Sequence, residues 1–398
     1  MDYRSIAVVT GAAMTLVAGP TSAQEDDNDY EFSFNGRVRI EGVEENNGLR
    51  DATSATARIR AGLSTPNYGG WSGIAEIEAI ENVGGDDFNS GSNGRTDFSV
   101  VLDHEDVEVN QLAVGYRDNQ HNLQLGRQRM VFDNARHFGD VAYRQNQQTF
   151  DALRYVNTSL AGQRFAYAYM TRARRFLGDE NPVGEIDMSS HLFNYRLQRL
   201  SGDVLSAYAY LVDVDTAAVR QNSIKTFGLR YVGSYATQAG DLLYTLEYAN
   251  QSDFGDGLTT NDADYVLAEA GIKFKNEWVA KLGQERLHGD GVYGFQTPFG
   301  TNHAFNGLAD LFAARTPEDG LVDTYANVTA PLLGARVRLA AHSFTADRGG
   351  RDYGTELDFT LEKRFAEHFA LNLLFADYRA DAFGVDTTKW VVWLDVRY

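Results

Sequence analysis

The chain has no cysteine in its 398 residues. A disulfide framework, a thiolate metal site and a lipid anchor attached through cysteine are therefore excluded. Proline is also scarce, with six residues, whereas tyrosine and phenylalanine are abundant at 21 and 23 residues. This composition suits β-strands and the aromatic girdles of membrane barrels. We expect no metal and no cofactor.

Long hydrophobic runs are missing as well. After the first residues, no continuous apolar segment reaches the roughly 20 residues of a membrane helix, and the mean hydropathy is below zero. A helical membrane protein is thereby excluded. A transmembrane β-barrel remains compatible, because its strands alternate and half of their residues face water.

The first residues have the pattern of a secretory signal peptide. Arg4 supplies a basic start, an apolar run extends from Ile6 to Gly19, and "GPTSA" precedes Gln24. The run of roughly 14 residues is too short to span a bilayer. We therefore expect residues 1–23 to be removed on export and residues 24–398 to form one domain.

The formal net charge is -19. Nucleic acid is excluded as a partner, because binding a phosphate backbone requires a basic surface. The acids concentrate in predicted loops such as "GGDDF" and "LDHEDVE", whereas the arginines concentrate in alternating segments. The net charge therefore hides a separation of the two signs.

The stretch "FSFNGRVRIEG" shows the alternation that recurs along the chain. With a period of two, Phe32, Phe34 and Ile40 share one face, and Arg37 and Arg39 lie on the other. Alternation and turn signals predict about eighteen strands, near 30–43, 53–65, 70–82, 107–117, 120–128, 150–157, 163–173, 189–199, 203–213, 223–235, 239–250, 263–274, 276–286, 321–331, 334–345, 353–364, 367–378 and 387–398.

Short and long connections alternate between these strands. Tight turns such as "RDNQ" and "PLLG" alternate with long polar segments, of which 83–106, 129–149 and 287–320 are examples. This asymmetry is typical of an antiparallel up-and-down outer-membrane barrel with short periplasmic turns and long extracellular loops. The predicted location is the outer membrane of a Gram-negative bacterium, with membrane lipid and lipopolysaccharide as partners. The apolar faces then point to lipid, and the charged faces point to the lumen.

The alternation predicts a lumen lined by basic side chains. A set of guanidinium groups in a narrow channel selects for anions. Inward acids such as Glu41, Glu78 and Glu285 leave an alternative, in which acids on neighbouring strands neutralise the arginines. The predicted pore-lining, substrate-binding residues are Arg37, Arg39, Arg58, Arg60, Arg129, Arg144, Arg154, Arg196, Arg230, Lys281 and Arg338, with Arg172 and Arg336 as further inward candidates.

Two long segments are predicted to shape a constriction, because loops of this length in compact proteins are usually functional. They extend from Gly126 to Tyr155 and from Gly294 to Tyr325, and "NGLADLFAAR" in the second has a short helical period. A solvated surface loop is the alternative for each segment.

The same two segments carry motifs of a known family. The first motif comprises Gly126, Arg127, Gln128, Arg144, Gln145, Asn146, Phe150 and Asp151. The second comprises His303, Phe305, Gly307, Ala309, Asp310, Phe312, Thr316, Pro317, Gly320, Leu321 and Asp323. With these motifs the chain resembles the bacterial alginate-export outer-membrane proteins, although Tyr143 and Leu308 stand where that family commonly has tryptophan. The resemblance implies an eighteen-stranded barrel with an electropositive conduit for a uronate polysaccharide.

Two functions share this architecture. The first is a channel that passes an anionic polysaccharide or oligosaccharide such as alginate, and polymer export would require periplasmic secretion machinery as a partner. The second is an uptake porin for small anionic nutrients such as carboxylates, phosphate or oligosaccharides. An enzyme is not expected, because His342 and Ser343 form the only suggestive local pair, and adjacent strand residues point to opposite faces.

Overall fold

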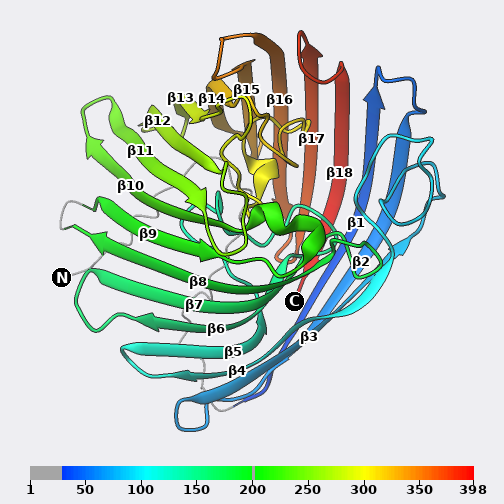
Figure 1. Ribbon diagram of the computed structural model, residues 1–398. Helices are drawn as coiled ribbons and strands as arrows, with labels where there is room; N and C mark the ends of the chain where they lie inside the picture. Colours follow the sequence, from blue (N-terminus) through cyan, green and yellow to red (C-terminus); the bar gives the residue numbers. More distant parts are fainter. Residues whose placement is uncertain (1–28, 200–201) are drawn as a thin grey trace.

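The computed structural model describes residues 29–199 and 202–398, and the predicted signal peptide lies outside them. The described residues form one closed sheet of 18 antiparallel strands (Figure 1). Consecutive strands pair along the chain, and β1 (Glu31–Glu45) also pairs with β18 (Thr387–Arg397), which closes the ring. The barrel predicted from the alternation is confirmed.

The other strands differ from the predicted ranges only at their ends. No helix in the described part of the chain is long and apolar enough to cross a membrane. Two 3₁₀ helices, η1 (Ala217–Asn222) and η2 (Asn302–Ala304), lie in loops. The strands between β1 and β18 are β2 (Ala52–Ser64), β3 (Trp71–Asn82), β4 (Asp106–Arg117), β5 (His121–Gln128), β6 (Thr149–Asn157), β7 (Gln163–Arg174), β8 (Glu185–Gln198), β9 (Val204–Val212), β10 (Ile224–Ala236), β11 (Gly240–Asp253), β12 (Asp262–Phe274), β13 (Val279–Leu287), β14 (Leu321–Leu332), β15 (Ala335–Thr345), β16 (Asp352–Phe365) and β17 (Phe369–Ala380).

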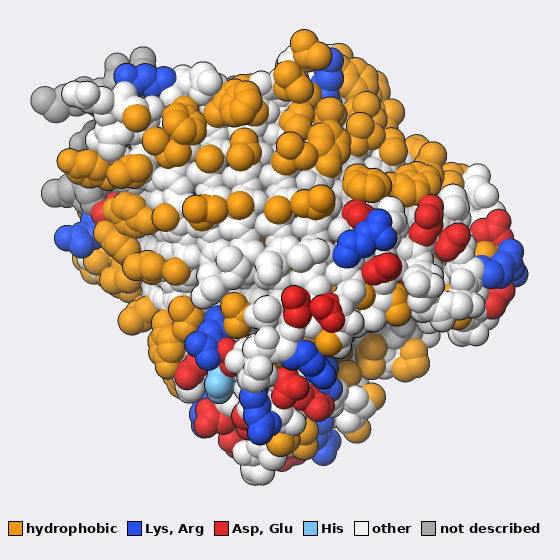
Figure 2. Space-filling view, turned by 90° about the horizontal axis from the view of Figure 1, so that it is seen from above, with side chains coloured by type: hydrophobic (Ala, Val, Ile, Leu, Met, Phe, Trp, Pro, Cys, Tyr) orange, Lys and Arg blue, Asp and Glu red, His pale blue; other side chains and the backbone are white. Residues whose placement is uncertain are grey.

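The barrel has its apolar side chains outside and its charged side chains inside. In β1, Val38 and Ile40 are exposed, whereas Arg39 and Glu41 are fully buried. Leu282 on β13 and Leu339 on β15 are likewise exposed. Figure 2 shows rows of hydrophobic side chains along one side of the outer wall, with charged groups gathered toward one edge. A wall of this kind is suited to lipid, because it removes apolar surface from water and encloses the charges.

One β-bulge overturns a predicted orientation. Arg172 on β7 was expected to face the lumen, but the register between β7 and β8 shifts after Met170. Ala173 is now buried, and Arg172 lies on the opposite face, with its Nε 2.6 Å from Asp187 Oδ1. The prediction was wrong because an inserted residue exchanges the two faces of a strand.

The expected helical turn in residues 306–315 was also wrong. This part of the β13–β14 loop forms successive turns, and the nearby helical element is η2. Asn306, Gly307 and Asp310 have φ values of 57°, 86° and 69°. Left-handed backbone at these positions prevents a continuous right-handed helix.

Candidate functional site

The β5–β6 loop, residues 129–148, folds into the barrel instead of extending from its rim. Gln145 and Gln148 have exposed fractions of 0% and 1%. Arg37 on β1 donates from Nη1 to the carbonyl oxygens of Ala142 and Tyr143, both at 3.1 Å. Arg39 donates to the Tyr143 carbonyl at 2.6 Å. Guanidinium groups on the wall therefore hold the loop through its backbone.

The second strand extends this attachment. Arg58 and Arg60 donate to the carbonyl oxygen of Gln145 at 3.3 and 3.0 Å. Arg60 also pairs with Glu78, as Arg37 does with Asp395 at 2.8 Å. The four arginines predicted on β1 and β2 do face inward. The loop and the acids cover them, however, so they anchor the loop instead of lining open space.

The β13–β14 loop, residues 288–320, enters the barrel as well and meets the β5–β6 loop. The rings of Phe138 and Phe299 stack with centroids 5.8 Å apart. Gly139 donates its backbone N–H to the Phe299 carbonyl at 3.0 Å, and Thr301 donates to the Ala135 carbonyl at 2.9 Å. The two segments predicted to shape the constriction therefore form one packed plug in the lumen.

Arg144 connects this plug to the wall. Its Nη1 lies 3.1 Å from Glu41 Oε2 on β1, and its Nη2 lies 3.4 Å from Asp310 Oδ2 in the β13–β14 loop. Lys389 on β18 approaches the same two carboxylates. Although burial alone would raise it, neighbouring His303, Lys389 and Arg144 hold the pKa of Asp310 well below its usual range.

Two of the three predicted cations on the β10–β15 wall are neutralised. Arg230 Nη1 lies 2.9 Å from Glu247 Oε2, and Lys281 Nζ lies 2.8 Å from Glu269 Oε1. Arg338 lies near them and lines a small cavity of about 40 Å³. The alternative that acids neutralise the arginines therefore holds for Arg230 and Lys281.

The wall formed by β6, β7 and β8 is different. Arg164 and Arg196 are register partners, and Arg154 on β6 donates to Gln124 Oε1 at 3.0 Å. Within residues 29–199 and 202–398, neither Arg154 nor Arg164 forms an ion pair with a carboxylate, and Arg196 lies 3.8 Å from Asp133. Together with Arg338, which also forms no ion pair among the described residues, these three guanidinium groups are the least neutralised of the predicted lumen cations and their neighbours.

The last of the predicted pore-lining residues is Arg129, which lies in the β5–β6 loop. Arg129 pairs with Asp140 at 2.5 Å, and its side chain is 43% exposed. Sequence reasoning missed Arg164, although its alternation with the exposed Phe165 could have placed it inward. It also missed Arg175, because loops have no period that reveals the direction of a side chain.

The described ranges contain no grouped metal ligands, and they place His342 and Ser343 on opposite faces. No three His, Cys, Asp or Glu side chains there are grouped so that they could hold a metal ion. His342 is buried, with Nδ1 3.0 Å from Asp323 Oδ1, while Ser343 is exposed on the other face. The predicted separation of these two neighbours is confirmed.

Comparison with known proteins identifies the architecture. No protein-family model and no curated protein sequence matches the chain. The solved structure of OccAB4 from Acinetobacter baumannii matches with a TM-score of 0.72 and 14% identity, over 93% of this chain and 98% of its own. The outer membrane protein OpdK from Pseudomonas aeruginosa matches with a TM-score of 0.73 and 13% identity, over 93% and 98%. The fold is that of an outer-membrane porin.

This porin fold and the apolar outer wall confirm the predicted location in the outer membrane of a Gram-negative bacterium. A structure of OpdK with vanillate gives a TM-score of 0.74 at 12% identity, again over 93% of this chain and 98% of its own. At this level of identity the likeness establishes the fold, and the solute has to be argued from the site.

Proposed function

We propose that the protein is an outer-membrane porin for the uptake of small anionic molecules, the second of the two functions predicted from the sequence. The observation that carries this proposal is the row formed by Arg154, Arg164 and Arg196, two of which have no ion pair among the described residues. An inward cation without a carboxylate partner remains available to a passing anion. Several weak sites of this kind attract a solute and still release it.

The β12–β14 wall supports the preference for the β6–β8 side. Glu269, Glu285 and Asp323 lie around the cavity of about 40 Å³ there. Each is paired with a basic side chain, Lys281, Arg136 and His342 respectively, so this wall is close to neutral and an anion is attracted mainly by the arginines of β6–β8. The arginines of β1 and β2 contribute less, because the β5–β6 loop covers them.

Alginate export is less well supported than uptake of small solutes. A polysaccharide chain requires a wide conduit, whereas the cavities beside the plug, of about 220 and 40 Å³, have the size of small solutes. The residues behind the resemblance to alginate-export proteins also have a packing role here, since Arg144, His303 and Asp310 join the two loops. The motifs therefore fit a plugged barrel without requiring a polymer as solute.

Ion selectivity tests the proposal directly. The refolded protein is placed in a planar bilayer under a KCl gradient, and the reversal potential is compared with that of the triple variant R154Q/R164Q/R196Q. We expect anion preference in the wild type and a several-fold loss in the variant. The control is R95Q/R351Q/R379Q, which removes the same charge from exposed positions, two in loops and one near the end of β17, and should retain most of the preference.

The solute is tested with vanillate, an aromatic carboxylate, and with an oligouronate. Permeation of vanillate into liposomes that contain the protein, together with weak or no block by oligouronate, is expected. Unchanged ion selectivity in R154Q/R164Q/R196Q would overturn the proposed role of these arginines. Strong block by oligouronate without vanillate permeation would instead favour the polysaccharide channel.

A further inference from the structure

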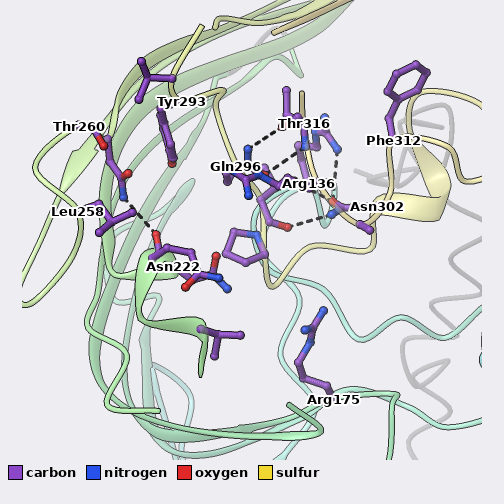
Figure 3. A pocket seen from close by; sticks show the side chains of 18 residues that line it. Arg136, Arg175, Asn222, Leu258, Thr260, Tyr293, Gln296, Asn302, Phe312 and Thr316 are labelled. Carbon is purple, nitrogen blue, oxygen red and sulfur yellow. Dashed lines mark hydrogen bonds between the residues drawn. The ribbon is translucent and has the colours of Figure 1, made fainter. Parts of the chain in front are cut away.

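A cavity of about 220 Å³ lies on the long-loop side of the barrel (Figure 3). Five loops contribute to it: β5–β6, β7–β8, β9–β10, β11–β12 and β13–β14. Leu258 and Val292 at its rim are 54% and 59% exposed. The cavity is thus accessible from the side at which an external solute arrives.

The cavity is basic although the whole chain is acidic. Arg136, Arg175 and Arg315 line it, and the described lining residues include no aspartate or glutamate. Arg136 has a partner outside the lining, with its Nε 2.9 Å from Glu285 Oε1. Arg315 lies at the exposed edge, 3.7 Å from Glu318. The three guanidinium groups therefore extend from the solvent edge to the buried floor.

Arg175 is the group in this set with unused hydrogen-bonding capacity. Among residues 29–199 and 202–398, its side chain has no carboxylate partner, and its Nε is buried without a hydrogen-bond acceptor. Burial lowers the pKa of Arg175 to about 10, so the group stays charged at neutral pH. Figure 3 shows its guanidinium pointing across the cavity toward the loop that carries Asn302. A buried donor without an acceptor is costly, and an incoming carboxylate would satisfy it in a bidentate arrangement.

The remaining walls are suited to the carbon skeleton of such a ligand. Val219, Leu258, Val292, Tyr293 and Phe312 supply apolar and aromatic surface around the arginines. A site with apolar walls and a few convergent polar groups is typical for small organic ligands. Inorganic phosphate would leave this apolar surface unused.

We propose that this cavity is an outer binding site, where Arg175 holds the carboxylate of a small aromatic or aliphatic acid before the acid passes to the arginines of β6–β8. The inference rests on the proposed uptake function and names a ligand class for it. Arg315 attracts the anion at the exposed edge, Arg175 binds it, and the apolar walls contact its carbon skeleton. Arg136 completes the basic floor through its ion pair and its hydrogen bonds to Asn302 and Asn306.

Binding of vanillate to the purified, refolded protein tests this assignment by isothermal titration calorimetry. R175Q should weaken binding about tenfold or more, the size expected for a lost charge-assisted contact. Vanillyl alcohol, which has the same ring without the carboxylate, should bind weakly to both proteins. R351Q removes the same charge from a neighbouring loop and should bind vanillate like the wild type.

A second variant keeps the proposal testable if R175Q fails to fold. V292E places an acid at the exposed rim, where the barrel should tolerate it, and it should also weaken vanillate binding. Unchanged affinity in both R175Q and V292E would overturn the outer site. If R154Q/R164Q/R196Q then lowered the affinity, the acid would bind only in the lumen and the proposed uptake function would stand. If the triple variant changed neither affinity nor ion selectivity, both proposals would fail.

Discussion

The ring of Tyr143 stacks on the imidazole of His303, with centroids 3.4 Å apart and ring planes inclined by 13°. Tyr143 belongs to the β5–β6 loop and His303 to the β13–β14 loop, so this contact joins the two halves of the plug. The guanidinium carbon of Arg39 lies 4.2 Å from the centroid of the Tyr143 ring, which links the stack to the barrel wall. These rings therefore hold the two halves of the plug against each other and against the barrel wall.

Replacing Tyr143 tests the stack. Tyr143→Ala should loosen the plug and raise single-channel conductance and open-state noise, because it removes both the stacked ring and the cation–π contact. Tyr143→Phe keeps the ring, and the hydroxyl it removes has no hydrogen-bond partner in the described structure. The conductance of Tyr143→Phe should therefore equal that of the wild type. If Tyr143→Ala had the same conductance and open-state noise as the wild type, the stack would not limit the passage.

Arg144→Ala should have a larger effect than Arg129→Ala. Loss of Arg144 leaves Glu41 and Asp310 with fewer partners in a buried site, and breaking such a network costs about 3 kcal/mol. Arg129 is partly exposed and pairs with Asp140 alone, so its loss should cost about 1 kcal/mol or less. Urea unfolding of the refolded barrels measures the difference, and equal losses would contradict the assignment of Arg144 as the connecting residue.

Substitutions at two glycines distinguish the cost of backbone strain from the cost of a steric clash. Gly307 has a φ of 86°, and an added Cβ would collide with the Glu356 carboxylate. Gly334, in the β14–β15 turn, has a φ of 75° with nothing within 4 Å of such a Cβ. Gly334→Ala should cost about 1 kcal/mol from strain alone, with unchanged conductance. Gly307→Ala should cost more and also displace the β13–β14 loop, which would appear as altered conductance.

Acidification should loosen the plug. Burial, with a contribution from Lys389 and Arg144, lowers the pKa of His303 below its usual range, against the opposing effect of Asp310. The packed loop therefore holds the imidazole neutral. As the pH falls below about 6.5, a released loop would bind a proton that the packed loop resists. The stability that the plug gains from burying neutral His303 is therefore complete above that pH and decreases as the pH falls below it.

Recordings at pH 7.5 and 5.5 should therefore show more loop-dependent gating at the lower pH. His303→Gln removes the titrating group and should abolish this difference. Asp310 does not contribute in this window, because its pKa lies well below it. Gating that persists unchanged between the two pH values in the wild type would contradict the role of His303.

Much of the architecture could be predicted from local sequence patterns. Alternation along β1 placed Val38 outside and Arg39 inside, because successive strand residues point to opposite faces whatever lies elsewhere in the chain. Alternating short and long connections predicted the two edges of the barrel, because consecutive connections of an up-and-down antiparallel barrel lie at opposite ends. The pattern failed at Arg172, where one inserted residue exchanged the faces.

The sequence by itself thus determined the barrel, its orientation toward lipid and the basic character of its interior. Only the tertiary structure decided which of these charges remain available. Arg39 and Arg154 are both inward, but a loop about one hundred residues further along the chain covers Arg39, whereas no such carboxylate or backbone contact neutralises Arg154 in the described residues. The difference arises because alternation governs the face of a side chain, while its partners come from loops and strands that only closure of the ring brings together.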